Sequence, residues 1–206
     1  MKTTYFIGEK FTLFLTKLIY RMKVFGQENI PQKGGFILAS NHISYFDPPF
    51  VGAWTKREVY FMAKQELFRN PISRWFFHNT NSLPVKRGLF DRKAIEICVN
   101  TAKSGHGMTI FLEGTRAKSG IFLPPKPGIG MIVKQLDCPI VPAYIHGSNR
   151  LGACFFGREK LSVRYGKPID PGWADQFPAS KEGYSAIAHE VMDKIKALQQ
   201  ETLAVI

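Results

Sequence analysis

Cysteine is scarce in this 206-residue sequence, and the three cysteines, Cys98, Cys138 and Cys154, are widely spaced and form no Cys-x-x-Cys pair. This pattern predicts neither a disulfide framework nor a zinc site, and it fits a reducing, cytoplasmic setting. The sequence also lacks an apolar run of about 18 residues, which a membrane-spanning helix requires. Its N-terminus has no small-residue cleavage site of a secretory signal. We therefore expect the protein to meet lipid only from the membrane surface.

Acidic residues are also few, because 16 Asp and Glu stand against 28 Lys and Arg and leave a net charge of +12. This excess predicts attraction to polyanions: nucleic acid, anionic lipid headgroups, phosphorylated small molecules or acidic carrier proteins. Charge alone does not choose among them. Repeats and linker-like stretches are absent, and 45% of the residues are hydrophobic, which suffices for one sizeable core. We predict an N-terminal helix over residues 1–23 and one domain over residues 24–206.

Short apolar runs alternate with helical patterns after the first helix. The runs 36–39, 59–62, 108–112, 140–145 and 161–165 predict buried strands. Helices are expected between Asp91 and Gly105 and over 184–198, where apolar side chains recur at helical spacing. Strands that alternate with helices indicate an α/β domain with a mostly parallel or mixed sheet flanked by helices.

The N-terminal helix is predicted to be amphipathic and to contact the membrane. Residues 6–23 form a broad apolar arc when they are placed on a helix, and the basic residues lie outside the arc. This pattern is typical of a helix in the membrane interface, although a helix packed on its own core shows the same arc. We favour membrane contact because Phe6 and Leu13 are apolar beyond the arc. The arc comprises Ile7, Phe11, Phe14, Leu15, Leu18, Ile19 and Met22, and the basic residues are Lys10, Lys17, Arg21 and Lys23.

The first motif with chemical potential follows the predicted strand 36–39, where Asn41-His42 is separated by a short loop from Asp47-Pro48. If the loop turns back, the carboxylate of Asp47 can accept a hydrogen bond from one imidazole nitrogen of His42. The other nitrogen is then available as a base toward a substrate hydroxyl. An acceptor alcohol activated in this way would attack a thioester directly, without an acyl-enzyme intermediate. The structural alternative is that Asp47 caps a helix that begins at Pro48.

The second motif, Glu113-Gly114-Thr115-Arg116, follows the predicted strand 108–112. Glycine lets the backbone approach a ligand closely, threonine supplies a hydroxyl, and arginine matches phosphate oxygens with two parallel donors. A phosphate site is one interpretation, and a charged surface turn is the other. The cations that would join a phosphate site, if the fold brings them together, are Lys64, Lys86, Arg87 and Lys126.

The ordered pair of motifs, His-x-x-x-x-Asp and then Glu-Gly-Thr-Arg, resembles the lysophosphatidic acid acyltransferases of the glycerolipid acyltransferase superfamily. The resemblance extends over residues 24–165. Its further blocks are Gly26 with Glu28-Asn29-Ile30-Pro31, Ala63-Lys64 with Glu66-Leu67, Pro84-Val85 with Arg87, Phe111, Lys126-Pro127-Gly128 and Ile140-Val141-Pro142. The chain departs from the family pattern at Asn81, where glycine is usual, at Lys86, where aspartate is usual, and at Leu112, where proline is usual.

The resemblance implies that the protein moves a fatty acyl group from an acyl thioester to the free hydroxyl of lysophosphatidic acid and so produces phosphatidic acid. His42 would be the general base and Asp47 its orienting partner. The implied acceptor site consists of Lys64, Arg87, Glu113, Gly114, Thr115 and Arg116. Acyl coenzyme A or acyl carrier protein would be the co-substrate, and neither a metal nor another cofactor is expected. The implied location is the cytoplasmic face of the cell membrane, as a peripheral or monotopic protein.

Other acceptors and one non-enzymatic function fit parts of the same pattern. Glycerol 3-phosphate, or a lysophospholipid with a headgroup, also combines an alcohol with a phosphate. A basic protein that binds RNA or membrane would use His42 and Asp47 only structurally, but no nucleic-acid motif occurs and we expect no nucleic-acid partner. Ordinary structural or surface roles are expected for the histidines without ligand spacing, His78, His106, His146 and His189.

Overall fold

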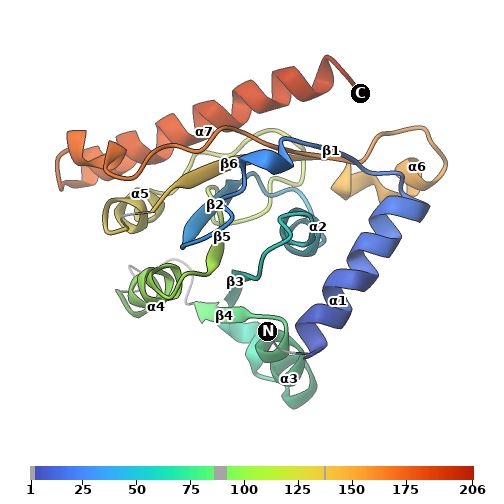
Figure 1. Cartoon of the computed structure of the whole chain (residues 1–206), viewed down its shortest axis with the longest axis horizontal. Coiled ribbons are helices and arrows are strands. Elements are labelled where there is room, and N and C mark those ends of the chain that lie inside the picture. Colours follow the sequence, from blue (N-terminus) through green and yellow to red (C-terminus); the bar gives the residue numbers. More distant parts are fainter. Residues whose placement is uncertain (1–2, 86–91, 137) are drawn as a thin grey trace.

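The computed structural model describes residues 3–85, 92–136 and 138–206. In this part of the chain, a seven-stranded mixed sheet lies between two groups of helices (Figure 1). The strand order is β1-β7-β6-β2-β5-β3-β4, and the pairings are parallel except for the antiparallel pair of β6 and β7. The predicted single α/β domain with a mixed sheet, flanking helices and an N-terminal helix is confirmed.

The strands are β1 Lys23–Phe25, β2 Phe36–Ser40, β3 Val59–Lys64, β4 Ser82–Val85, β5 Gly107–Phe111, β6 Ile140–His146 and β7 Ser162–Tyr165. The α-helices are α1 Thr3–Phe14, α2 Asp47–Ala53, α3 Pro71–Asn79, α4 Arg92–Lys103, α5 Pro127–Lys134, α6 Leu151–Phe155 and α7 Lys181–Leu203. A π-helical turn, Leu15–Ile19, continues α1, and two of the 3-10 turns are Gln65–Phe68 and Ser148–Arg150.

Strand β2 occupies the middle of the sheet, between β5 and β6, and all five of its residues are buried. A strand that is covered on both faces has a continuous apolar sequence instead of an alternating one, which accounts for the run Phe36–Ala39. Each fully buried Leu, Ile or Phe contributes roughly 1.5–3 kcal/mol through its removal from water. The strand that leads to His42 is therefore held firmly.

The two faces of the sheet have separate hydrophobic cores. One core joins the sheet to α4, α5 and α7, and the other joins it to α1, α2 and α6 (Figure 1). Helix α7 buries Ile187, Val191 and Ile195 at the spacing that the sequence predicted. It also packs closely on α5, because Gly130 faces the backbone of Tyr184 and a Cβ at this glycine would collide with that carbonyl.

Several elements of the structure were not expected from the sequence. The short strands β1 and β4 and the helices α3, α5 and α6 were not predicted, and Lys126, which was assigned to a turn, directly precedes α5. Asn81 stands where glycine is usual and adopts a left-handed φ of 56°, which asparagine tolerates better than most residues. Its side-chain amide donates to Glu58 at 2.8 Å. The predicted helix start at Asp91 lies outside the described residues.

The first helix ends earlier than residue 23, and its apolar arc faces outward. Arg21 takes a left-handed φ of 47°, after which Lys23 joins β1. The side of the helix that packs on the protein carries Thr12 and Thr16, together with Tyr5. Thr16 donates to the carbonyl of Thr12 at 2.7 Å and accepts from the indole N–H of a half-buried tryptophan at 3.1 Å. The exposed members of the arc are Ile7, Phe11, Phe14, Leu18 and Ile19, whereas Leu15 is half-buried and Met22 is buried.

Apart from Met22, which is buried in the core, and Leu15, which is half-buried, the apolar arc therefore does not pack on the core of its own domain. Among the helices in the described ranges, none has both the length and the hydrophobicity that crossing a bilayer requires.

Candidate active site

The two motifs leave neighbouring parallel strands at the same edge of the sheet. His42 follows β2, and Glu113 follows β5, which pairs with β2 from Phe36 and Gly107 to Ser40 and Phe111. Beyond this register the two loops stay joined, because the amide of Leu112 donates to the carbonyl of Ser40 at 3.1 Å. The amide of Ala117 donates to the carbonyl of His42 at 2.7 Å. Because the carboxyl ends of parallel strands meet at one edge, residues 71 positions apart become neighbours.

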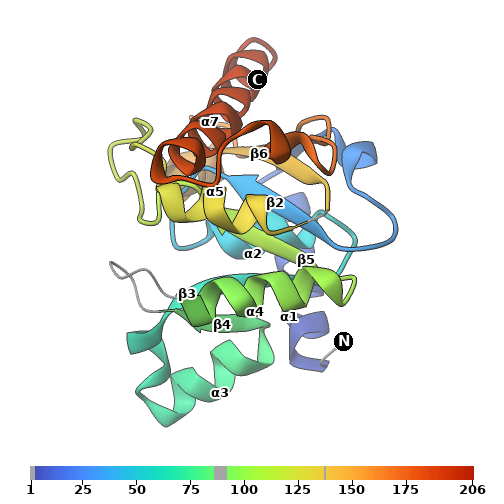
Figure 2. The same cartoon turned by 90° about the vertical axis from the view of Figure 1, so that its left-hand side faces the viewer.

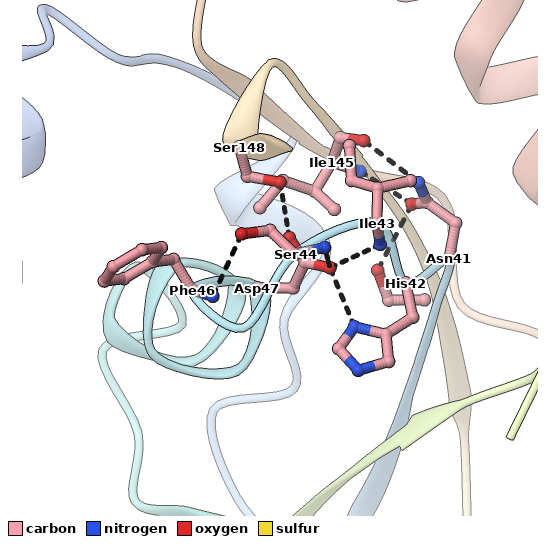
Figure 3. Close-up of polar contacts among 9 residues, drawn as sticks. Asn41, His42, Ile43, Ser44, Phe46, Asp47, Ile145 and Ser148 are labelled. Carbon is pink, nitrogen blue, oxygen red and sulfur yellow. Dashed lines mark hydrogen bonds and ion pairs between the residues drawn. The ribbon is translucent and has the colours of Figure 1, made fainter. Parts of the chain in front are cut away.

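His42 and Asp47 are in direct contact. The Nδ1 atom of His42 lies 2.8 Å from Oδ2 of Asp47, and both side chains are buried, with 9% and 0% of their surface exposed (Figure 3). A carboxylate only accepts hydrogen bonds, so Nδ1 carries the proton in this contact. The second ring nitrogen of His42, Nε2, then has a free lone pair and points away from Asp47 (Figure 3). This is the arrangement of a general base with an orienting carboxylate.

The carboxylate of Asp47 does not cap helix α2, so the structural alternative for this residue is wrong. Its Oδ2 atom accepts from the backbone amides of Ile43 and Ser44, at 2.6 and 2.7 Å, and both residues precede the helix. No side-chain hydrogen bond caps α2, which starts after Phe46 and has proline in its first turn. The carboxylate thus folds the loop back onto His42. It also engages two loop amides that would otherwise be candidates to stabilise an oxyanion.

Strand β6 and the turn after it hold the first motif through Ile145 and Ser148, two contacts that were not predicted from the sequence (Figure 3). Ser148 is buried and donates from Oγ to Oδ1 of Asp47 at 2.5 Å. Asn41 donates to the carbonyl of Ile145 at 3.0 Å and accepts from its amide at 2.9 Å. Ser148 stands 101 residues after Asp47 in the chain, so only the pairing of β2 with β6 brings them together. No local sequence signal identified this serine.

The ring of Phe111 completes the surroundings of the imidazole. It stacks on His42 with 4.2 Å between ring centroids and an interplanar angle of 23°. Together with the hydrogen bond to Asp47, this stacking leaves little freedom to rotate the imidazole. A base that is fixed before the substrate arrives does not lose rotational freedom in the reaction.

Glu113 is the most deeply buried member of the second motif. None of its surface is exposed, and within the described residues neither carboxylate oxygen has a hydrogen-bond partner of good geometry. Burial raises the pKa of Glu113 to about 7, and the charge of Asp47 acts in the same direction. The backbone amides of Leu123 and His42 lie close enough to lower this pKa, but burial dominates. Glu113 therefore titrates near neutral pH between the two motif loops.

The remaining residues of the second motif reach the surface. Gly114 has a left-handed φ of 65°, and a Cβ there would press on the aliphatic stem of Lys126, so this lysine joins the group. Thr115 is exposed. The guanidinium carbon of Arg116 lies 3.4 Å from the ring centroid of Tyr45, a residue of the His-x-x-x-x-Asp loop. Tyr45 was not singled out in the sequence, although an aromatic residue in this loop is a suitable surface for an arginine.

The two cationic residues that were predicted to join the site from other strands are Lys64 and Arg87, and the structure describes only Lys64. Lys64 ends β3, three residues beyond Phe61, which pairs with Thr109 of β5. It is exposed at the same sheet edge as Glu113, but no described hydrogen bond or ion pair joins it to the other predicted residues. Arg87 and Lys86 lie outside the described residues. The structure thus brings together His42 and Asp47, and beside them the segment Glu113–Arg116.

The other histidines have separate surroundings. His146 bonds to Glu159 at 3.1 Å, His106 packs on Tyr60, and His189 bonds to the carbonyl of Ser185. His78 packs on Phe68. Among the described residues, no cluster of three or more histidine, cysteine, aspartate or glutamate side chains has a geometry suited to a metal ion.

Comparisons with known proteins agree with this arrangement of residues. A family model described as Acyltransferase matches residues 21–146. The chain is 29% identical to a 1-acyl-sn-glycerol-3-phosphate acyltransferase of Bacillus subtilis, with 87% of this chain and 89% of that protein covered. It is also 29% identical to an enzyme of the same name from Streptococcus pneumoniae, with 85% of this chain and 65% of that protein covered.

A solved structure has the same fold. The 1-acyl-sn-glycerophosphate acyltransferase PlsC of Thermotoga maritima superposes with a TM-score of 0.71 over 95% of this chain and 79% of its own, at 26% identity. The chain belongs to the acyltransferase family, since the family model matches more than half of it. The resemblance that the two motifs predicted is confirmed, and several of its relatives are named for one acceptor, 1-acyl-sn-glycerol 3-phosphate.

Proposed function

We propose that this protein transfers a fatty acyl group from an acyl thioester to the free hydroxyl of lysophosphatidic acid and releases phosphatidic acid. The single observation that supports this most strongly is the contact between His42 and Asp47, buried at the end of a central strand in a chain of the acyltransferase family. The names of the relatives support lysophosphatidic acid as the acceptor.

In the proposed reaction, Nε2 of His42 removes the proton of the acceptor hydroxyl while that oxygen attacks the thioester carbonyl. The C–S bond of the resulting tetrahedral intermediate then breaks, and the imidazolium returns its proton to the leaving thiolate. Asp47 stabilises the imidazolium and keeps the ring in the productive tautomer. General-base assistance of this kind is worth about 10²- to 10⁴-fold in rate. The oxyanion donor is a group other than the amides of Ile43 and Ser44, since Asp47 already engages both.

The acceptor phosphate is proposed to bind beside Arg116. Thr115 is exposed and Lys126 lies against Gly114, so a hydroxyl and a second cation adjoin the guanidinium. The stacking of Arg116 on Tyr45 holds its charge at the His42 loop. Lys64 and Arg87 remain proposed members of this site on the basis of the family pattern. Glu113, which is fully buried, is proposed to shape the site from the protein interior. Arginine and lysine together supply the charge that a phosphate requires.

The reaction is proposed to take place at a membrane surface, on the cytoplasmic face where acyl coenzyme A and acyl carrier protein are available. Helix α1 supports this location because Ile7, Phe11 and Phe14 are exposed while the side toward the protein carries threonines. Its basic residues, Lys10 among them, add attraction to anionic lipid. Neither a metal nor another cofactor is proposed, because the His-Asp pair supplies the general base and the two substrates supply the acyl group and the hydroxyl that receives it.

The proposal is tested by supplying purified protein with lysophosphatidic acid and, in separate reactions, with acyl coenzyme A and acyl carrier protein thioester. Phosphatidic acid is expected with at least one donor, and the better donor is thereby identified. Glycerol 3-phosphate and a lysophospholipid with a choline headgroup serve as competing acceptors. A higher kcat/KM for either competitor would move the assignment to that acceptor. Binding of lipid or RNA without turnover of any acceptor would contradict the enzymatic function.

The contribution of Arg116 has a separate test. Arg116→Ala should mainly raise the KM for lysophosphatidic acid, because the arginine is proposed to grip the phosphate and not to take part in proton transfer. Arg158→Ala, which removes an exposed arginine on the segment after α6, is the matched control and should leave KM unchanged. An unchanged KM in Arg116→Ala would remove this residue from the acceptor site.

A further inference from the structure

Helix α3 carries large apolar side chains that the described part of the chain leaves exposed. No residue of this helix is fully buried in the structure. Ile72 is 80% exposed, Trp75 60% and Phe76 50%, and Leu67 in the preceding 3-10 turn is also exposed. A cluster of exposed large apolar residues on one short helix is uncommon on a protein surface that meets only water. The four side chains Leu67, Ile72, Trp75 and Phe76 are called the α3 patch below.

The α3 patch lies on a helix that is fixed in place by other residues. Asn70 caps the helix by accepting from the amide of Ile72 at 2.9 Å, and Pro71 occupies its first turn. On its inner side, Phe77 packs on the buried ring of Phe68. The fold of this segment therefore does not depend on the patch, and the patch remains available to another apolar surface.

Positive charge accompanies the α3 patch. A depression of about 460 Å³ beside the helix is lined by Arg69, Arg74 and His78, together with Glu66. Arg74 is held by a hydrogen bond from Nε to the carbonyl of Phe68 at 2.9 Å, and both arginines are exposed. Apolar side chains next to arginines match the boundary between the acyl chains and the phosphates of an anionic bilayer.

Helix α3, which carries the patch, also adjoins helix α1. The two helices are in contact, and both views place α3 beside the N-terminal end of α1 at the same end of the molecule (Figures 1 and 2). Phe6 and Ile7 are exposed in this part of α1, with Lys10 above the ring of Phe6 at 5.1 Å. Exposed apolar and cationic side chains of α1 and of α3 therefore occur at the same end of the molecule.

We propose that α3 is a second membrane-contacting element, whose patch enters the interface of an anionic phospholipid bilayer while Arg69 and Arg74 contact lipid phosphates. The proposal rests on the membrane contact of α1 in the proposed function and extends it to a separate helix. A lipid surface accounts for both features of α3, since apolar side chains gain from leaving water and the arginines gain from anionic phosphate.

This contact would have a consequence for the reaction. Helix α3 follows Lys64 after a single 3-10 turn, and Lys64 stands at the sheet edge of the two motif loops. A bilayer that binds both α1 and α3 therefore lies near this edge, so an acceptor lipid need not leave the membrane surface completely to reach His42. A helix that docks elsewhere on the molecule would not bring the catalytic edge to the lipid.

The test measures binding of the full-length protein to vesicles of phosphatidylcholine that contain phosphatidylglycerol. The double variant Ile72→Ser with Trp75→Ser should bind at least about tenfold more weakly than wild type, since two apolar anchors are lost. Its thermal unfolding should be unchanged, because neither side chain packs on the core. The control is Leu203→Ser, which removes a half-exposed leucine at the last residue of α7 and should bind like wild type. The C-terminal end of α7 and helix α3 lie on opposite sides of the molecule (Figure 1).

A direct readout uses Trp75 as the only tryptophan, in protein with Trp54→Phe and Trp173→Phe. Its fluorescence should shift to the blue on vesicles and be quenched by lipids with brominated chains. Equal binding of the double variant and wild type, with no quenching of Trp75, would overturn the role of α3 even if α1 docks. Self-association of wild type in solution that the double variant abolishes, without a change in vesicle binding, would assign the patch to a second copy of the chain. If wild type does not bind vesicles at all, the membrane contact of the proposed function fails as well.

Discussion

At the scale of single residues, Asp47 is the centre of the candidate site. Its carboxylate accepts hydrogen bonds from His42, from two loop amides and from Ser148. Each hydrogen bond to a charged group is worth about 1.5–3 kcal/mol, so this set of donors fixes the carboxylate firmly. Ser148 is therefore expected to act as a positioning residue through Asp47, without touching the substrate.

Ser148→Ala should lower kcat by about tenfold or more, because an unpaired carboxylate oxygen can move Asp47 away from its contact with His42. Ser148→Thr keeps the hydroxyl and should restore most of the rate. Initial rates over a range of acceptor concentrations separate kcat from KM, and KM should change little. Ser162→Ala is the matched control, since Ser162 is buried and its hydroxyl has no partner among the described residues. Loss of activity in Ser148→Ala that threonine does not restore would contradict the positioning role.

Glu113 predicts a pH dependence of stability. Its pKa in the folded protein is raised to about 7 from an ordinary value of 4.5, so the folded state binds a proton more tightly than the unfolded state. The free energy of unfolding should therefore fall as the pH rises from about 5 to about 8, by an amount on the order of 3 kcal/mol from this group. Below pH 4.5, the ordinary pKa of glutamate, the group is protonated in both the folded and the unfolded state, so it no longer makes the free energy of unfolding depend on pH.

Urea unfolding of wild type and Glu113→Gln across this pH range is the corresponding measurement. The variant should lose less stability as the pH rises, because glutamine remains neutral. Parallel pH dependences for the two proteins would exclude a raised pKa at this position.

At the scale of elements, α1 and the π-helical turn Leu15–Ile19 that continues it invert the usual arrangement of an amphipathic helix. Phe11 and Phe14 face outward, and Thr16 is fully buried and bonded to Trp54. Replacement of exposed phenylalanines normally costs little stability, whereas removal of a buried hydroxyl leaves its partner unsatisfied, at about 1–3 kcal/mol. The polar side of this helix should thus matter more for folding than its apolar side.

Two variants compare the sides of α1. Phe11→Ser with Phe14→Ser should leave the thermal midpoint nearly unchanged and weaken binding to anionic vesicles. Thr16→Ala should lower the thermal midpoint and leave vesicle binding of the folded protein intact. The opposite result, destabilisation by the serine variants with unchanged vesicle binding, would show that the apolar face serves the fold.

The elements that the sequence predicted are those with long or buried apolar patterns. Strand β2 and helix α7 were found because continuous burial and helical spacing leave clear signatures. Strands β1 and β4 are only three and four residues long and are mostly half-buried, so they lack a clear apolar run; strand β7 is equally short, but most of its residues are buried and it was predicted. The outward orientation of the α1 arc could not be read from its spacing either, because both orientations give the same periodicity.

At the scale of the whole molecule, the site was predictable to the extent that it lies in local motifs. His42, Asp47 and the Glu113–Arg116 segment were identified from their spacing in the chain. Ser148, Tyr45 and the role of Phe111 were not, because their contacts arise only when β2 is placed between β5 and β6. Tertiary contacts of this kind have no signature in a single sequence.

The net charge of +12 gives a property of the molecule as a whole. Attraction to an anionic bilayer should weaken as salt rises, since the distance over which charges act falls from about 10 Å at 0.1 M to about 3 Å at 1 M salt. Vesicle binding measured over this range should decline but not vanish, because the exposed apolar residues of α1 also contribute. Vesicle binding that is independent of salt would show that the net charge does not contribute to membrane binding.

The central claim is that the imidazole of His42, oriented by Asp47, removes the proton of the acceptor hydroxyl. The most direct measurement is the rate of phosphatidic acid formation in a single turnover by wild type and by His42→Ala, with His189→Ala as the control for an exposed histidine that bonds to Ser185 of the same helix. We expect a loss of at least about a hundredfold in His42→Ala, with normal thermal unfolding, and a normal rate in His189→Ala. A rate in correctly folded His42→Ala close to that of wild type would contradict the account.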